Sequence, residues 1–203
     1  MRFSPRQPRN RKKLSDRPIT PRSNRPGYFE RLADRYRRYV VAHPDRQLAF
    51  CLAQSSFPAA VSVAARAIDH RGKIHGHQCW IGGGALNAFA PYLVPIIPQL
   101  EAAETFDEIH SLVESVAPYG IGELTIYDTA CRIAAYRRKH PTKVYLHCGT
   151  RVGAEKLLGP LRGRKFIEVT ELPMPLQQLG LTPGQLEDIL CIYKKEFELY
   201  PQK

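Results

Sequence analysis

The chain has 203 residues, of which 43% are hydrophobic, and it carries a formal net charge of +11 at pH 7. This length allows one domain with a sizeable core. The apolar stretch Ala88–Leu100 is short and interrupted by prolines, so we expect no membrane-spanning segment and no membrane partner. The basic balance favours a polyanionic partner such as DNA or RNA.

The positive charge is concentrated near the N-terminus. Residues 1–26 hold nine Lys or Arg and one acid, a net +8 that leaves only +3 for the rest of the chain. Arg, Pro, Ser and Asn dominate this segment, and such a composition is typical of chains that stay disordered. We therefore predict a disordered basic arm over residues 1–27 and one folded domain over residues 28–203.

The cysteines indicate a reducing compartment. They are Cys51, Cys79, Cys131, Cys148 and Cys191. Because their number is odd and no CxxC pair occurs, we expect free thiols, most of them small core residues. The N-terminus also lacks the apolar segment of a secretion signal, so we predict a cytoplasmic protein.

Apolar periodicity and helix-capping signals predict a mainly α, single helical domain with minor short strands. Thr105 and Thr182 each begin a capping box, in which a hydroxyl and an acidic or amide side chain satisfy helix-start N–H groups. In chain order, we expect helices over about residues 28–41, 45–54, 59–68, 105–116, 123–138, 149–158 and 182–199. A further helix, with Leu86, Phe89 and Leu93, is expected after Gly82–Gly84. Extended segments are expected at residues 144–146 and 163–169.

The segment His70–Trp80 is polar and broken by glycine, which predicts an ordered loop carrying functional groups. Its imidazoles, amide and indole could read or stack on a base, and its lysine could hold a phosphate. We predict that Lys73 contacts nucleic acid and that a base pocket is lined by His75, His77, Gln78 and Trp80, together with Tyr127. The alternative is a polar loop whose tryptophan is anchored in the core.

The turn Tyr119-Gly-Ile-Gly122 joins two predicted helices. The two glycines allow a tight turn with uncovered N–H groups, which form a phosphate seat together with the positive end of the next helix. Ile121 is expected to plug the space between the helices. We predict nucleic-acid contacts at Gly120, Ile121, Gly122 and Thr125; the alternative is a glycine cap in an ordinary helical hairpin.

The segment from Val116 to Thr125 resembles a helix-hairpin-helix DNA-binding motif, with the hairpin over about residues 105–138. With the following extended segment and helix, residues 103–160 are similar to the helix-hairpin-helix base-excision DNA glycosylases. The resemblance implies a DNA N-glycosylase that excises an unusual or modified base. In that family a catalytic Asp follows the hairpin, and some members carry a catalytic Lys within it; His147 and Leu124 stand at these places here.

Two residues are candidates for catalysis and three more for a second phosphate seat. Asp128 and His147 are the predicted catalytic residues, although Asp128 could instead form an ion pair with Arg132 on a solvated helix face. Gly149, Thr150 and Arg151 open a predicted helix and could bind a phosphate, or Thr150 could simply cap that helix. The acids of the last helix, Glu187 and Asp188 among them, are expected on a solvated face.

No cofactor and no metal are predicted, because nucleotide-binding glycine motifs and paired zinc-finger spacing are missing. The alternation of His75, His77 and Cys79, with His147 or Cys148 as a fourth ligand, leaves a zinc site open as an alternative.

The sequence thus predicts a DNA-binding protein, with an enzyme of the DNA glycosylase type as the leading hypothesis. One alternative is a non-catalytic helix-hairpin-helix DNA-binding module. Another is an RNA- or ribosome-associated basic protein, which the Arg/Pro-rich arm suits equally well.

Overall fold

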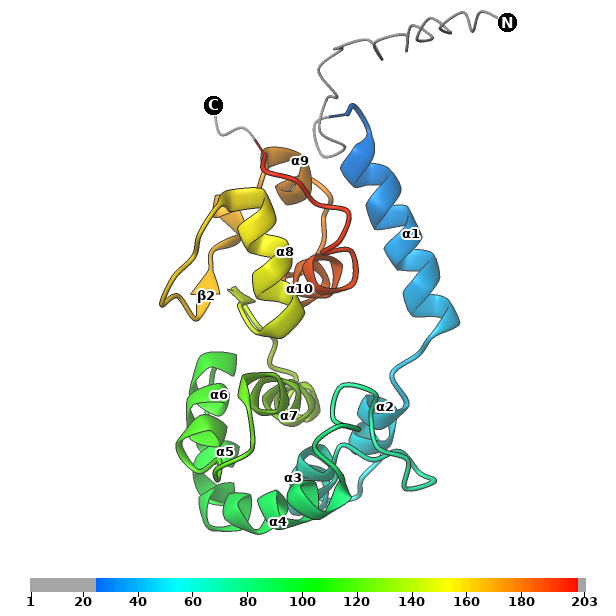
Figure 1. The fold of residues 1–203 in the computed structure, drawn as a ribbon. Helices are drawn as coiled ribbons and strands as arrows, with labels where there is room; N and C mark the ends of the chain where they lie inside the picture. The colour runs from blue at the N-terminus through cyan, green and yellow to red at the C-terminus, as the bar shows by residue number, and fades with distance from the viewer. Residues whose placement is uncertain (1–24, 201–203) are drawn as a thin grey trace, which may run out of the picture.

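The computed structural model describes residues 25–200 (Figure 1), so the predicted arm lies almost entirely outside the described part of the chain. The prediction of a mainly helical domain is confirmed. The helices are α1 (Tyr28–Ala42), α2 (Arg46–Leu52), α3 (Phe57–Arg66), α4 (Gly83–Leu93), α5 (Ile97–Ala102), α6 (Phe106–Ser115), α7 (Glu123–Tyr136), α8 (Cys148–Leu158), α9 (Met174–Gln177) and α10 (Pro183–Ile192). Strands β1 (Val144–Tyr145) and β2 (Phe166–Ile167) pair antiparallel, with Val144 opposite Ile167.

The described residues form two lobes, each with its own core. The helical lobe consists of α2 to α7, and its core includes Phe89, Leu93 and Ile133. The terminal lobe combines α1 with β1, α8, β2, α9 and α10, and its core includes Leu157 and Leu186. Figure 1 shows the chain starting in the terminal lobe, passing through the helical lobe and returning after α7.

Strand β1 joins the two lobes. Successive side chains of a strand point to opposite sides. Accordingly, Val144 and Leu146 pack into the terminal core, while Tyr145 between them packs into the helical core. The segment that follows α7 is therefore held from both sides, which fixes the position of the residues after it.

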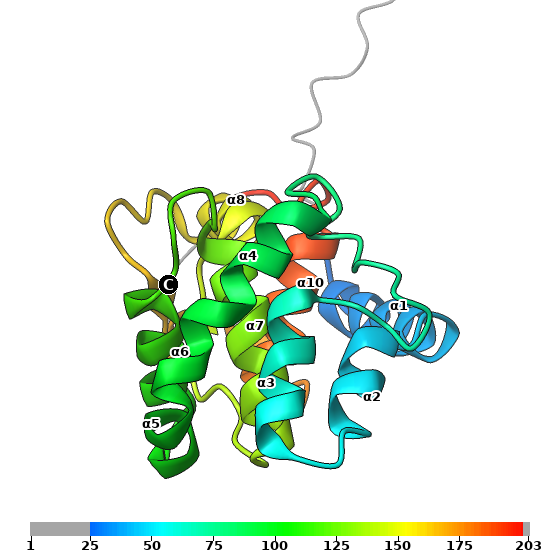
Figure 2. The ribbon, with the colours of Figure 1, turned by 90° about the horizontal axis from the view of Figure 1, so that it is seen from below.

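Helix α7 is central to the helical lobe. Figure 2 shows it with α2 and α3 on one side and α6 on the other. Thr125, Thr129 and Arg132 are buried on it as well as its apolar residues. One helix therefore presents polar groups to several neighbours at once.

The two capping signals correctly predict where their helices start. Thr182 and Gln185 form the predicted capping box of α10, with reciprocal contacts of 3.3 and 2.9 Å. Thr105 accepts from the Glu108 N–H at 3.2 Å, but Glu108 accepts from the N–H of Glu104 and so completes only half of the predicted box.

Helix α10 ends at Ile192 and not near Leu199 as expected. Tyr193 and Phe197, which fall within the predicted helix, lie beyond the observed one and are nevertheless buried in the terminal core. The two aromatic side chains are therefore buried, although the segment that carries them is not helical.

None of the helices in residues 25–200 is long and apolar enough to cross a membrane.

Candidate functional site at the junction of the lobes

The predicted hairpin is formed by α6, the turn at Gly120 and α7. Gly120 has φ +93°, a left-handed conformation that favours glycine. Ile121 is buried in the helical core, so the expected plug between the helices is confirmed. Gly120 and Gly122 are exposed, and no side chain caps the start of α7. The backbone is thus accessible where we predicted a phosphate seat.

Two predicted contacts on the hairpin are corrected by burial. Ile121 is 8% exposed and its N–H donates to the Pro118 carbonyl at 3.1 Å, so this residue is not presented to a nucleic acid. Thr125 is 2% exposed, because it lies on a face of α7 that packs inside the protein. Its hydroxyl is therefore not presented to a bound nucleic acid, and only the backbone of the turn remains available.

The side chains predicted to form a second phosphate seat have structural contacts instead. Gly149 and Thr150 are buried against α10, and the Thr150 hydroxyl donates to Glu187. The Arg151 guanidinium donates to the carbonyl oxygens of Leu146, Leu161 and Arg164 at 3.1, 3.3 and 2.8 Å. Arg151 thereby ties the loop between α8 and β2 to the end of β1.

A pocket beside the hairpin contains four rings. These belong to His110, Tyr127, Tyr145 and His147. The ring centre of Tyr127 lies 4.6 Å from that of His147 and 5.4 Å from that of Tyr145. Glu114, Glu123, Ile126, Leu146 and Lys165 complete the lining. Since Glu123 is the first residue of α7, the pocket adjoins the turn of the hairpin.

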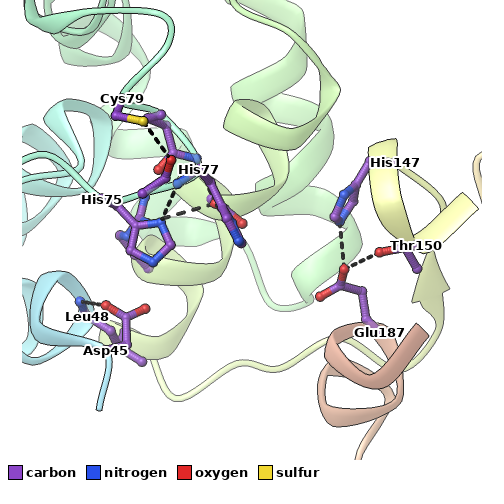
Figure 3. Close-up of polar contacts among 12 residues, drawn as sticks. Asp45, Leu48, His75, His77, Cys79, His147, Thr150 and Glu187 are labelled. Carbon is purple, nitrogen blue, oxygen red and sulfur yellow. Dashed lines mark hydrogen bonds and ion pairs between the residues drawn. The ribbon is translucent and has the colours of Figure 1, made fainter. Parts of the chain in front are cut away.

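His147 in the pocket wall is paired with a carboxyl group of α10 (Figure 3). Its Nε2 lies 3.3 Å from Glu187 Oε1, without hydrogen-bond geometry, and its Nδ1 has no partner among the described residues. Burial lowers the pKa of His147 to about 4. Burial, followed by the charge of Asp188, raises the pKa of Glu187 to about 8. At neutral pH the imidazole is therefore neutral and the carboxyl group protonated.

This carboxyl group was missed because we expected the acids of α10 on a solvated face. Glu187 is 6% exposed, and Asp188 accepts a 2.7 Å hydrogen bond from the Tyr36 hydroxyl of α1. Burial raises the pKa of Asp188 as well. The apolar pattern of the sequence does not identify this residue, because at about 100° per residue Glu187 lies roughly 60° outside the arc of Leu186, Ile189 and Leu190.

Asp128, the other predicted catalytic residue, faces the loop before α4. His77 Nδ1 and Gln78 Nε2 lie 3.0 and 2.6 Å from its Oδ2, and Arg132 approaches to 4.0 Å. Although burial opposes ionisation, the hydrogen bond with His77 and the charge of Arg132 lower the pKa of Asp128 to about 2. The alternative of an Asp128–Arg132 ion pair is therefore met in part: the pair is present, but the Arg132 side chain is only 4% exposed, so the pair does not lie on a solvated face.

The loop from His70 to Trp80 is ordered, as predicted. Asp69 accepts from the N–H groups of Arg71 and Lys73, and Gln47 donates to the Lys73 carbonyl. Trp80 is 93% exposed, so it is not anchored in the core. His77 and Gln78 surround Asp128, and of the five residues predicted for a base pocket only Tyr127 lines the pocket beside the hairpin.

No protein-family model, curated protein or solved structure matches the chain. The function is therefore argued from the hairpin, the pocket and the two groups of polar residues around α7.

Proposed function

We propose that the chain binds DNA and hydrolyses the N-glycosidic bond of an unusual or modified base. The observation that carries this proposal is the pocket beside the hairpin, which combines aromatic rings with the His147–Glu187 pair. An enzyme that acts on a base in a duplex must extrude it into a pocket, where ring stacking compensates for lost base stacking.

The hairpin supports the DNA-binding part of the proposal. The exposed backbone of Gly120 and Gly122 and the positive end of α7 together favour a phosphate. Because the pocket adjoins this turn, a strand held there brings a base to the pocket, and the rings of Tyr127, Tyr145 and His147, each at most 7% exposed, must move apart to admit it. The N-terminal arm, with most of the net charge, adds affinity without sequence preference.

The His147–Glu187 pair supports the chemistry. When the C1′–N bond breaks, its electron pair leaves with the base, which needs a proton, while water adds to C1′. The protonated Glu187 supplies this proton through the neutral His147 after a small rotation, and the proton lost by water restores the acid. Asp128, which faces the loop before α4 and does not line the pocket, has no role in this step.

The five cysteines support a cytoplasmic location. All of them are free thiols, from the buried Cys51 to the exposed Cys79 and Cys148. Free thiols are the usual state in a reducing compartment.

The test is incubation of the full chain with duplexes that carry deaminated, oxidised or alkylated bases. Released base is measured by mass spectrometry and abasic sites by alkaline cleavage. We expect release from at least one substrate, reduced by about 10²-fold or more in Glu187→Gln. The matched control is Glu101→Gln, an exposed carboxyl group on α5, which should leave the rate unchanged.

No release from any substrate at high protein concentration would overturn the enzymatic proposal. The same result with tight duplex binding would favour the non-catalytic DNA-binding module, which the accessible hairpin supports by itself. Competition between duplex DNA and structured RNA separates both of these from an RNA-associated protein.

A further inference from the structure

We propose that His75, His77 and Asp128 bind a divalent transition-metal ion. The ligand atoms of these three side chains all lie within 4.8 Å of one another. Two come from the loop before α4 and one from α7, so folding of the helical lobe brings them together. This inference does not rest on the proposed function.

The ligand set matches a known preference of transition metals. Two imidazoles and one carboxylate hold zinc in catalytic sites and non-haem iron in facial triads, and both arrangements leave positions open. Metal–ligand bonds of about 2.1 Å place tetrahedral ligand atoms about 3.4 Å apart, so the cluster has to contract by roughly 1 Å. The His75 and His77 rings, whose centres lie 4.6 Å apart, would have to supply this contraction by rotation of their side chains.

Neighbouring groups hold the carboxylate in place. Gln78 donates to Asp128 Oδ2 at 2.6 Å, and Arg132 lies 4.0 Å from the same oxygen. No described residue contacts Oδ1 of Asp128 by a hydrogen bond, so this oxygen is available for an ion. Outer-shell partners of this kind orient ligands in metal sites.

Buried polar atoms beside the cluster also point to a further ligand. Gln78 is fully buried, and its Oε1 has no partner among the described residues. The same holds for Nε and Nη1 of Arg132, whose side chain is 4% exposed. Unpaired buried groups cost about 1–3 kcal/mol each. A metal ion with bound water or an anion in its open positions would offer these groups partners.

The proposed ligand set differs from the one that sequence spacing suggested. An extended chain would place Cys79 beside the two histidines, but residues 76–81 form turns and the Cys79 thiol contacts the Gly76 carbonyl. Asp128, distant in sequence, takes its place. The prediction of no metal followed from local spacing and did not consider this residue.

The experiment is titration of the chelator-treated full chain with Zn²⁺ and with Co²⁺. Zinc binding is followed by calorimetry and cobalt binding by visible absorption. We expect one ion per chain and a loss of affinity of more than about 100-fold in His75→Ala and in His77→Ala. His70→Ala is the matched control, since this exposed histidine of the same loop lies outside the cluster. Circular dichroism checks that each variant folds.

Three results would overturn the proposal. The first is that no stoichiometric binding occurs. The second is that the folded His75 and His77 variants bind as tightly as the parent, and the third is that Cys79→Ser abolishes binding. Asp128→Asn tests the carboxylate, and His75→Ala and His77→Ala keep the test decisive if that buried substitution prevents folding. All readouts are made without DNA, so a failed glycosylase assay leaves this result unaffected.

Discussion

His147 and Glu187 connect two segments of the terminal lobe that are distant in sequence, with Nε2 and Oε1 3.3 Å apart. His147 follows β1, whereas Glu187 lies in α10, and the hydroxyl of Thr150 in α8 donates to the same carboxyl group. Both partners are almost fully buried. Their protonation is therefore set by the fold and in turn affects its stability.

Stability should fall as pH rises above 6.5 because of Glu187. Its pKa is raised from 4.5 to about 8 on folding, so between these values the folded chain holds a proton that the unfolded chain has released. Stability tied to this proton is lost as pH rises. His147 has the opposite effect on stability, but only below its ordinary pKa of 6.5. Above that pH its imidazole is neutral in both the folded and the unfolded chain.

The measurement is urea unfolding of the parent and of Glu187→Gln from pH 6.5 to 8. Over this range the parent should lose about 1–2 kcal/mol more than the variant, whose amide does not titrate. Asp128 and Asp188, whose charges also act on Glu187, are present in both proteins. Glu101→Gln should follow the parent, and parallel curves for the parent and Glu187→Gln would show that Glu187 is already ionised.

Helices α8 and α10 should not tolerate a larger residue at Gly153. A Cβ there would lie 2.1 Å from the Leu190 carbonyl oxygen, which belongs to the backbone and cannot rotate away. We expect Gly153→Ala to lower the free energy of unfolding by about 3 kcal/mol. Gly184→Ala is the control, because its Cβ meets open space and alanine favours a helix, so a gain of up to about 1 kcal/mol is expected. Equal stability of both variants would contradict this packing.

The sequence predicts those parts of the fold that depend on local chemistry. Thr182 and Gln185 fix the start of α10, and Ile121 between two glycines identifies the hairpin plug. The end of α10 was predicted wrongly, because Tyr193 and Phe197 continue the apolar pattern of a helix while being buried in a non-helical segment. The spacing of apolar residues indicates which side chains are buried, and a buried segment does not have to be helical.

The candidate site was harder to predict because its residues meet through tertiary contacts. Asp128 and His147 were chosen from their positions around the hairpin, but the partner of His147 comes from α10. Glu187 is an acidic residue that is buried in the fold, whereas sequence rules assign acidic residues to the surface. Arg151 shows the same difficulty, since nothing local indicates that three carbonyl groups surround its guanidinium.

Arg151 should stabilise the fold without contributing to nucleic-acid affinity. Lysine offers one nitrogen in place of the two guanidinium nitrogens that bind these three carbonyl oxygens, so Arg151→Lys should cost about 2 kcal/mol in urea unfolding. Arg162→Lys, an exposed change in the neighbouring loop, should cost nothing measurable. Both variants should keep the salt dependence of duplex binding. Because lysine keeps the charge, the contact itself is tested with Arg151→Gln: a salt slope lowered by about one in that variant would restore the phosphate contact predicted from the sequence.

Hairpin and arm should contribute to DNA binding in separable ways. Residues 1–24 hold eight Lys or Arg and one acid, so their deletion should reduce the slope of log affinity against log salt by at most about 6. Gly120→Val should instead weaken binding at every salt concentration with the arm present, because valine strains a backbone with φ +93° and displaces the seat. Gly163→Val is the matched control, a glycine with φ +72° and open space around it in the loop before β2. If Gly120→Val and Gly163→Val bind duplex equally well in fluorescence anisotropy, the arm alone holds the DNA and the hairpin is only a structural turn.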